Sequence, residues 1–165
     1  MNKWKIQSTI KEITIILALL FIMSNIISYI RAPDLRSSQL PKIEANLVDG
    51  STFSVQKGKP LILHFWAISC PACKLEAPNI ETVSKEYDVL TIAVNSGSDE
   101  EVKTYMQENG LSFKVFNDVH GVWATEFNIN VYPTTFIYDA KGKLRFTEVG
   151  YTTTAGLLAR LEWIE

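Results

Sequence analysis

The only two cysteines of this 165-residue chain lie three positions apart, in FWAISCPACKLEAP, and their surroundings restrict the fold. Before them, residues 60–67 form a nearly continuous apolar run of β-formers, which is typical of a central strand covered on both faces. After them, residues 71–87 have helical periodicity, with Leu75, Ile80 and Val83 as expected core positions. The cysteine pair therefore lies where a buried strand ends and a helix begins.

The rest of the chain after residue 40 alternates between strand and helix patterns. Two short alternating runs flank Asp49-Gly50, which indicates a β-hairpin. Residues 89–95 predict a second central strand, and Ser98 with Glu101 forms the capping box of the next helix. We also expect a strand at 113–116, a helix at 119–127, two strands joined by a turn at 141–142, and an amphipathic helix at 154–164. This order predicts an α/β fold with a central mixed β-sheet flanked by helices and preceded by a β-hairpin.

The first forty residues follow a different pattern. Residues 13–30 contain no charged side chain, and a run of about this length is near the minimum for a helix that crosses a bilayer. We expect an uncleaved transmembrane anchor there, after a cytoplasmic N-terminus at 1–12 and before a polar linker at 31–40. A cleaved signal peptide is the alternative, but the usual pattern of small residues at a cleavage site is missing.

Charge suggests an orientation and excludes one class of partner. Three lysines precede the apolar run, and Arg31 and Arg36 follow it, so the positive-inside rule favours a cytoplasmic N-terminus. The domain at 41–165 is then expected outside the cytoplasm. A net charge of −2 argues against a nucleic-acid partner.

The position of the cysteines predicts different chemistry for each. Cys70 is expected to be the N-cap of the helix, with Pro71 at the first helical position, where its missing N–H costs nothing. First-turn amides and the helix dipole then favour the Cys70 thiolate, which lowers the thiol pKa below its free value of about 8.5. Cys73, one turn deeper, has its Cα about 5 Å away, within disulfide range. Glu76 shares a helix face with Cys73, and we expect it half-buried and able to take the Cys73 proton.

Three chemistries are open to such a pair. A purely structural disulfide between positions i and i+3 closes a very small loop and removes little entropy from the unfolded chain. A zinc or copper site needs about four ligands, and His64 and His120 lack the spacing to complete one, so we expect no metal. Thiol–disulfide exchange is favoured, because the thiolate is the form that attacks disulfides.

Two segments resemble a known family. FWAISCPACKLEAP is similar to the W-x-x-x-C-x-x-C-x-x-x-x-P signature of the thioredoxin fold, and VYPTTFIYDAKGKL to its second signature. The C-x-x-C-x-x-E-x-P spacing, the leading hairpin and the insertion at 97–118 resemble the membrane-anchored, extracytoplasmic TlpA-like or ResA-like branch. A subgroup linked to suppression of copper sensitivity is a closer candidate within it. The resemblance covers residues 41–165.

The resemblance implies a role for each matching residue. Cys70 would be the nucleophile, Cys73 the resolving thiol of a Cys70–Cys73 redox disulfide, and Glu76 the active-site carboxylate. The bond before Pro133 would be cis, which exposes backbone for pairing with a substrate chain. The substrate-binding residues would be Pro71, Tyr132, Pro133 and Thr134. Trp66 is added to them because it lies just before the cysteine pair, with a place in the core as the alternative.

Two positions depart from the family pattern. Ser69 stands where most relatives have an aromatic residue before the first cysteine, which opens or polarises the surface beside the sulfur. His64 lies on the strand position where cytoplasmic thioredoxins keep a buried acid. It is either a satisfied core histidine or a group that handles protons.

These features together predict a membrane-tethered, extracytoplasmic thiol–disulfide oxidoreductase that needs no cofactor. The resemblance implies a single-pass protein of the inner (cytoplasmic) membrane whose domain faces the periplasm. Its partners would be proteins with disulfides or thiols, a membrane thiol donor of the DsbD/CcdA type, and membrane lipid around the anchor. Family likeness favours a reductant. A DsbA-like thiol oxidase and a copper-handling binding module are the alternatives.

Overall fold

The computed structural model describes residues 3–35, 37–56 and 58–164. Its elements in order are α1 Lys3–Arg31, β1 Glu44–Asn46, β2 Thr52–Ser54, β3 Leu61–Trp66, α2 Pro71–Val83, β4 Asp88–Val94, α3 Asp99–Glu108, β5 Lys114–Asp118, α4 Val122–Glu126, β6 Thr134–Tyr138, β7 Leu144–Val149 and α5 Thr154–Ile164. The order of hairpin, βαβαβα and ββα predicted for the domain is confirmed.

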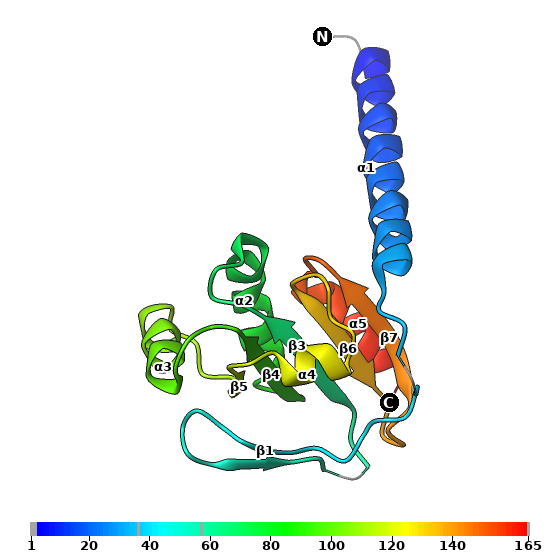
Figure 1. Cartoon of the computed structure of the whole chain (residues 1–165). Coiled ribbons are helices and arrows are strands. Elements are labelled where there is room, and N and C mark those ends of the chain that lie inside the picture. The colour runs from blue at the N-terminus through cyan, green and yellow to red at the C-terminus, as the bar shows by residue number, and fades with distance from the viewer. Residues whose placement is uncertain (1–2, 36, 57, 165) are drawn as a thin grey trace.

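The five longer strands form one mixed sheet in the order β5-β4-β3-β6-β7, and β1 pairs with β2 in a separate hairpin (Figure 1). Strands β3, β4 and β5 are parallel, whereas β6 runs antiparallel to both β3 and β7. Helices α2, α3 and α5 contribute to the apolar cluster on one face of the sheet. Helix α4 and the hairpin contribute to the cluster on the other. The predicted α/β architecture is therefore confirmed.

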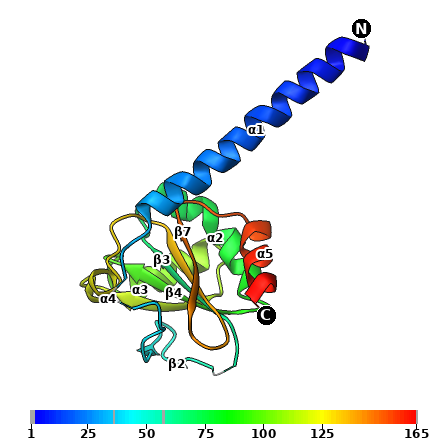
Figure 2. The same ribbon diagram turned by 90° about the vertical axis from the view of Figure 1, so that its right-hand side faces the viewer.

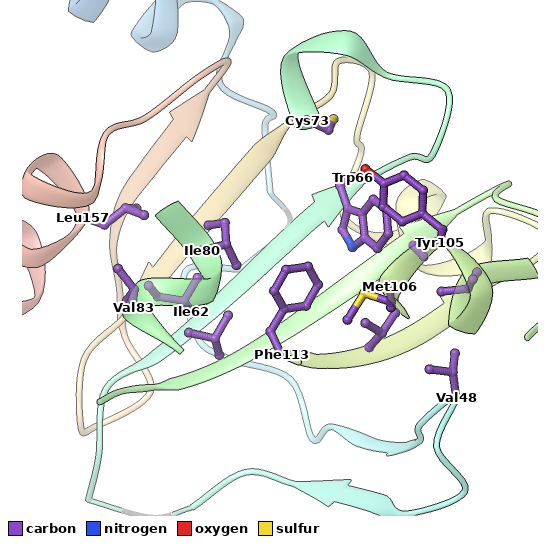
Figure 3. Close-up of a cluster of buried hydrophobic side chains, with 14 of the residues drawn as sticks. Val48, Ile62, Trp66, Cys73, Ile80, Val83, Tyr105, Met106, Phe113 and Leu157 are labelled. Carbon is purple, nitrogen blue, oxygen red and sulfur yellow. The ribbon is translucent and has the colours of Figure 1, made fainter. Parts of the chain in front are cut away.

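Strand β3 lies at the centre of this arrangement, and all six of its residues are buried. Ile62 and Trp66 point into the cluster beneath α2 (Figure 3), whereas Leu61, Leu63 and Phe65 point into the opposite cluster. This alternation follows from the two-residue period of a strand. Burial on both faces explains why the sequence of β3 reads as an unbroken apolar run.

The core position predicted for Leu75 is wrong, because its side chain is 72% exposed. The buried residues of α2 are Cys73, Glu76, Ile80 and Val83, whose spacing of three, four and three follows one face of a helix. Leu75 lies between two of these positions and points away from the sheet.

Helix α1 begins at Lys3, so it includes most of the segment predicted as a separate N-terminus as well as the apolar run. Within it, Ile10–Arg31 is long and apolar enough to cross a membrane. The helix extends away from the domain (Figures 1 and 2). Its last turns contact β7, where the Val149 amide donates to Ser28 Oγ at 2.9 Å and Ser28 is buried.

The end of the expected polar linker is bonded to the domain. The Leu144 amide donates to the Ser38 carbonyl at 2.7 Å, and the Leu40 amide donates to the Gly142 carbonyl at 2.7 Å. Residues 38–40 therefore pair with the start of β7 and the turn before it. Of the residues in the predicted segments, Met1, Asn2, Arg36, Lys57 and Glu165 lie outside the described part of the chain.

Candidate active site

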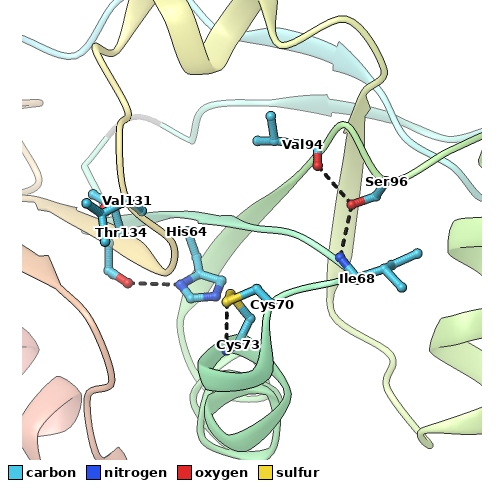
Figure 4. Close-up of a disulfide and its surroundings, with 9 residues drawn as sticks. His64, Ile68, Cys70, Cys73, Val94, Ser96, Val131 and Thr134 are labelled. Carbon is cyan, nitrogen blue, oxygen red and sulfur yellow. Dashed lines mark hydrogen bonds between the residues drawn. A yellow bond between two sulfur atoms is a disulfide. The ribbon is translucent and has the colours of Figure 1, made fainter.

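Cys70 and Cys73 form a disulfide at the point where β3 gives way to α2 (Figure 4). Cys70 is the N-cap of α2, with extended backbone, and the Cys73 amide donates to Cys70 Sγ at 3.1 Å. The two Cα atoms are 5.3 Å apart. Cys73 is buried and Cys70 is only partly buried. One sulfur therefore faces the surface, and the other lies against the core.

The turn that carries Cys70 is fixed to the neighbouring strand by Ser96, a residue that the sequence analysis did not identify. The Ile68 amide donates to Ser96 Oγ at 3.1 Å, and that hydroxyl donates to the Val94 carbonyl at 3.0 Å (Figure 4). The Cys70 amide also donates to the Ala67 carbonyl at 3.1 Å. The only sequence signal for Ser96 is its place just after a predicted strand.

A second loop lies at the same edge of the sheet. The Tyr132–Pro133 peptide bond is cis. Thr134 pairs with Phe65 of β3, so Pro133 lies at the level of Trp66, on the strand end that leads to Cys70. The Gly150 amide donates to the Pro133 carbonyl at 2.8 Å and fixes the loop from the other side.

The structure places the other expected substrate-binding residues at different depths. Pro71 is exposed beside Cys70, and Tyr132 is partly exposed. Pro133 and Thr134 are buried. Trp66 is only 3% exposed and packs against Tyr105 and Phe113, with ring centroids 5.5 and 6.1 Å away, so its indole supports the site from the core.

Glu76 lies deeper than expected, because its side chain is fully buried and not half-buried. Its Oε1 accepts a hydrogen bond from the Thr152 amide at 3.0 Å, while Oε2 is buried without a partner in the described part of the chain. Burial disfavours the charged form and raises the pKa of Glu76 to about 8. The carboxyl is therefore mostly protonated at neutral pH, on the same buried face of α2 as Cys73.

His64 is buried on β3, and Figure 4 shows it among the side chains around the disulfide. Its Nδ1 is hydrogen bonded to Thr135 Oγ1 at 2.9 Å. Burial lowers the pKa of His64 to about 3, so the imidazole is neutral over the physiological range. The other histidine, His120, lies in an exposed turn after β5.

Comparison with known proteins gives consistent results. Residues 32–147 match the model of the AhpC/TSA family. The chain is 31% identical over 165 residues to a thioredoxin-like protein of Haemophilus influenzae, with 98% of each chain covered. It is 29% identical over 138 residues to the thiol-disulfide oxidoreductase ResA of Geobacillus thermodenitrificans, covering 81% of this chain and 76% of that protein.

The fold has a solved counterpart. The crystal structure of StoA from Bacillus subtilis superposes with a TM-score of 0.66 at 26% identity, covering 78% of this chain and 99% of that one. The aligned portion therefore includes nearly all of the StoA chain.

Proposed function

Since this chain belongs to the AhpC/TSA family, among thioredoxin-like relatives that include a named thiol–disulfide oxidoreductase, we propose that α1 tethers it to the membrane and that it reduces protein disulfides outside the cytoplasm. It is itself a thiol–disulfide oxidoreductase of the ResA and StoA type with a close cysteine pair. We place it in the inner membrane as a single-pass protein, with the domain on the periplasmic side.

The observation that carries this proposal is the different setting of the two sulfurs. Cys70 is partly exposed at the start of a 13-residue helix, where an amide already donates to its sulfur. Both the amide and the helix dipole stabilise a thiolate there. Cys73 is buried one turn further on. This geometry suits a nucleophile at the surface and a resolving thiol behind it.

The reaction needs only the two sulfurs and the substrate disulfide. The Cys70 thiolate attacks one substrate sulfur, the substrate S–S bond breaks, and a mixed disulfide forms as the first substrate thiolate leaves. Cys73 then loses its proton and attacks Cys70 Sγ, which releases the second substrate thiolate. Two electrons pass to the substrate, and the pair ends as the disulfide that the structure contains.

We propose that Glu76 takes up the proton that Cys73 loses. Both side chains are buried on the same face of α2, three positions apart. A group with a pKa of about 8 exchanges protons readily near neutral pH, which is the condition for general acid–base catalysis. The carboxylate accepts the proton when Cys73 attacks. The protonated acid returns it when Cys73 leaves during re-reduction of the pair.

The electrons for each cycle are proposed to come from a membrane thiol donor of the DsbD/CcdA type, because an oxidising compartment lacks a reducing pool. The opposite direction, thiol oxidation, is the second candidate function. It is favoured by the amide that donates to Cys70 Sγ, because stabilising the thiolate stabilises the reduced form. The reduction potential separates the two: a value of about −120 mV, as for a strong oxidant, would overturn the reductase proposal.

Trapping of partners tests the exchange reaction itself. In the Cys73→Ser variant, release of the mixed disulfide fails, so covalent adducts on Cys70 are expected on non-reducing gels and should vanish on reduction. The Cys70→Ser variant is the matched control and should form none. If Cys73→Ser forms no adducts and the reduced protein instead holds copper at one equivalent, the protein is a metal-binding module and the exchange proposal is wrong.

A further inference from the structure

The carboxyl ends of four strands meet at one edge of the sheet. Strands β3, β4 and β5 are parallel, and β7 runs in the same direction because β6 is antiparallel to both β3 and β7. The end of β3 leads to Cys70, and the end of β7 at Val149 lies beside the cis-proline loop. We call this the disulfide edge.

The anchor helix is attached at the disulfide edge. Ser28 of α1 accepts the Val149 amide at 2.9 Å, and Val149 pairs with Thr134, the residue after Pro133. Ser28 is buried by this contact, although most of α1 is exposed. Figures 1 and 2 show α1 leaving the domain on the side where α2 begins. The attachment therefore sets the direction in which the disulfide faces.

The length of α1 leaves little distance between the attachment and a bilayer. The apolar segment Ile10–Arg31 has 22 residues, about 33 Å of helix at about 1.5 Å per residue, and a bilayer core is about 30 Å thick. Ser28 lies three residues before the end of this segment. A spanning α1 with Ser28 docked on Val149 holds the disulfide edge at the bilayer surface.

The part of the disulfide edge next to α1 also carries exposed apolar side chains. Outside α1, the described residues include five large apolar side chains that are exposed: Leu75, Val119, Val122, Tyr151 and Trp163. Leu75 belongs to α2, and Tyr151 in the loop after β7 accepts a hydrogen bond from Asn79 of α2 at 3.1 Å, so both lie on the part of the disulfide edge where α1 is attached. Val119 and Val122 follow β5, at the far end of the sheet. Exposed apolar side chains beside a reactive group favour a contact surface over a solvated one.

We propose that the end of α1 is a docking element that holds the disulfide edge against the bilayer, and that this contact presents the Cys70–Cys73 pair to the membrane thiol donor of the proposed function. This inference rests on the proposed function. The partner is a protein and not the lipid itself, because re-reduction requires a thiol. A partner thiolate attacks Cys70 Sγ, the Cys70–Cys73 bond breaks, and Cys73 leaves and takes up a proton. The partner's second thiol then releases Cys70, which leaves the pair reduced and the partner oxidised.

Ser28→Leu tests the docking, because it removes the acceptor for Val149 and is too large for the buried position, while leaving α1 apolar. Thr14→Leu makes the same kind of change on α1 away from β7 and is the matched control. Ser28→Thr keeps a hydroxyl and should behave as the unmodified protein. In cells, the reduced fraction of the Cys70–Cys73 pair should fall at least fivefold in Ser28→Leu relative to Thr14→Leu.

A parallel assay separates failure of this inference from failure of the proposed function. Exchange of the full chain in detergent with a small disulfide should be equal in Ser28→Leu and Thr14→Leu. If that exchange is absent even in the unmodified protein, the proposed function and this inference both fail. If it is intact and the two variants have the same reduced fraction in cells, the docking inference alone is wrong.

Photo-crosslinking identifies what faces the disulfide edge without depending on the folding of Ser28→Leu. A benzophenone amino acid is placed at Leu75 or Tyr151, and at Lys141 in the β6–β7 turn on the opposite edge as the control. We expect adducts from the first two positions with an integral membrane protein that is also recovered as a mixed disulfide on Cys70. Adducts with lipid alone would make the bilayer the occupant and overturn the proposed partner. Equal adducts from Lys141 would overturn the orientation.

Discussion

Replacing Glu76 by glutamine should change how stability depends on pH. Burial raises the pKa of Glu76 from 4.5 to about 8 in the folded protein, so the folded state holds a proton that the unfolded chain releases above pH 4.5. The stabilisation from this proton is complete below pH 4.5 and is lost as the pH rises towards 8. Each pH unit in this interval removes about 1.4 kcal/mol, or about 3 kcal/mol between pH 5 and pH 7.5.

The Glu76→Gln variant keeps a side-chain oxygen that can accept the Thr152 amide, but its amide group carries no titratable proton. The free energy of unfolding of Glu76→Gln, minus that of the unmodified protein, should therefore increase by about 3 kcal/mol from pH 5 to pH 7.5. The assay is urea unfolding of the full chain in mild detergent with the disulfide intact, followed by tryptophan fluorescence at several pH values. Taking the difference cancels groups that titrate in both proteins.

The direction in which this free-energy difference changes with pH tests whether the pKa of Glu76 is raised. A difference that is independent of pH would show that the Glu76 carboxyl has an ordinary pKa and is hydrated, and a decreasing difference would show that the folded state stabilises its ionised form. Either result would contradict the inference that burial keeps the Glu76 carboxyl protonated. It would also remove the basis for assigning the Cys73 proton to Glu76.

Two further substitutions test titratable side chains whose pKa values the fold shifts. Burial disfavours ionisation of Glu81, but hydrogen bonds from Ser112 and the Phe113 amide outweigh it and lower its pKa. Glu81→Gln should therefore lower the free energy of unfolding by about 1–3 kcal/mol at pH 7 in the urea assay. The loss should become smaller as the pH falls through the lowered pKa of Glu81. An equal loss at pH 7 and in acid would contradict this. Burial lowers the pKa of His64 from 6.5 to about 3, so stability decreases as the pH falls through this interval. His64→Gln should remove this dependence, which amounts to about 1.4 kcal/mol per pH unit, so acid unfolding should occur at a lower pH. An unchanged midpoint of acid unfolding would show that His64 takes up a proton as readily in the folded protein as in the unfolded chain.

The elements of the domain are predictable from the sequence where the signal is local. The capping box of Ser98 and Glu101 is present with both hydrogen bonds, and the last helix occupies 154–164 as predicted. Cys70 is the N-cap of α2 with Pro71 at the start of the helix, as predicted from four consecutive residues. In each case, the residues that determine the structure are neighbours in the chain.

The features that sequence did not predict depend on distant residues. Glu76 is fully buried because the loop at Thr152, 76 positions later, covers it and bonds to it. The end of the expected linker lies against the domain because Ser38 pairs with Leu144, a contact that no local pattern indicates. The exposure of Leu75 follows from which face of α2 meets the sheet, and hydrophobicity alone does not specify that face.

The acidity of the Cys70 thiol shows whether the start of α2 activates this sulfur for exchange. In the reduced Cys73→Ser variant, Cys70 is the only thiol, so thiolate absorbance at about 240 nm measured against pH gives its pKa without a coupled group. We expect a value well below about 8.5, because a first-turn amide and the helix dipole stabilise the thiolate. A pKa at or above the ordinary value would show that the start of α2 does not activate this sulfur, and would contradict the proposed exchange reaction.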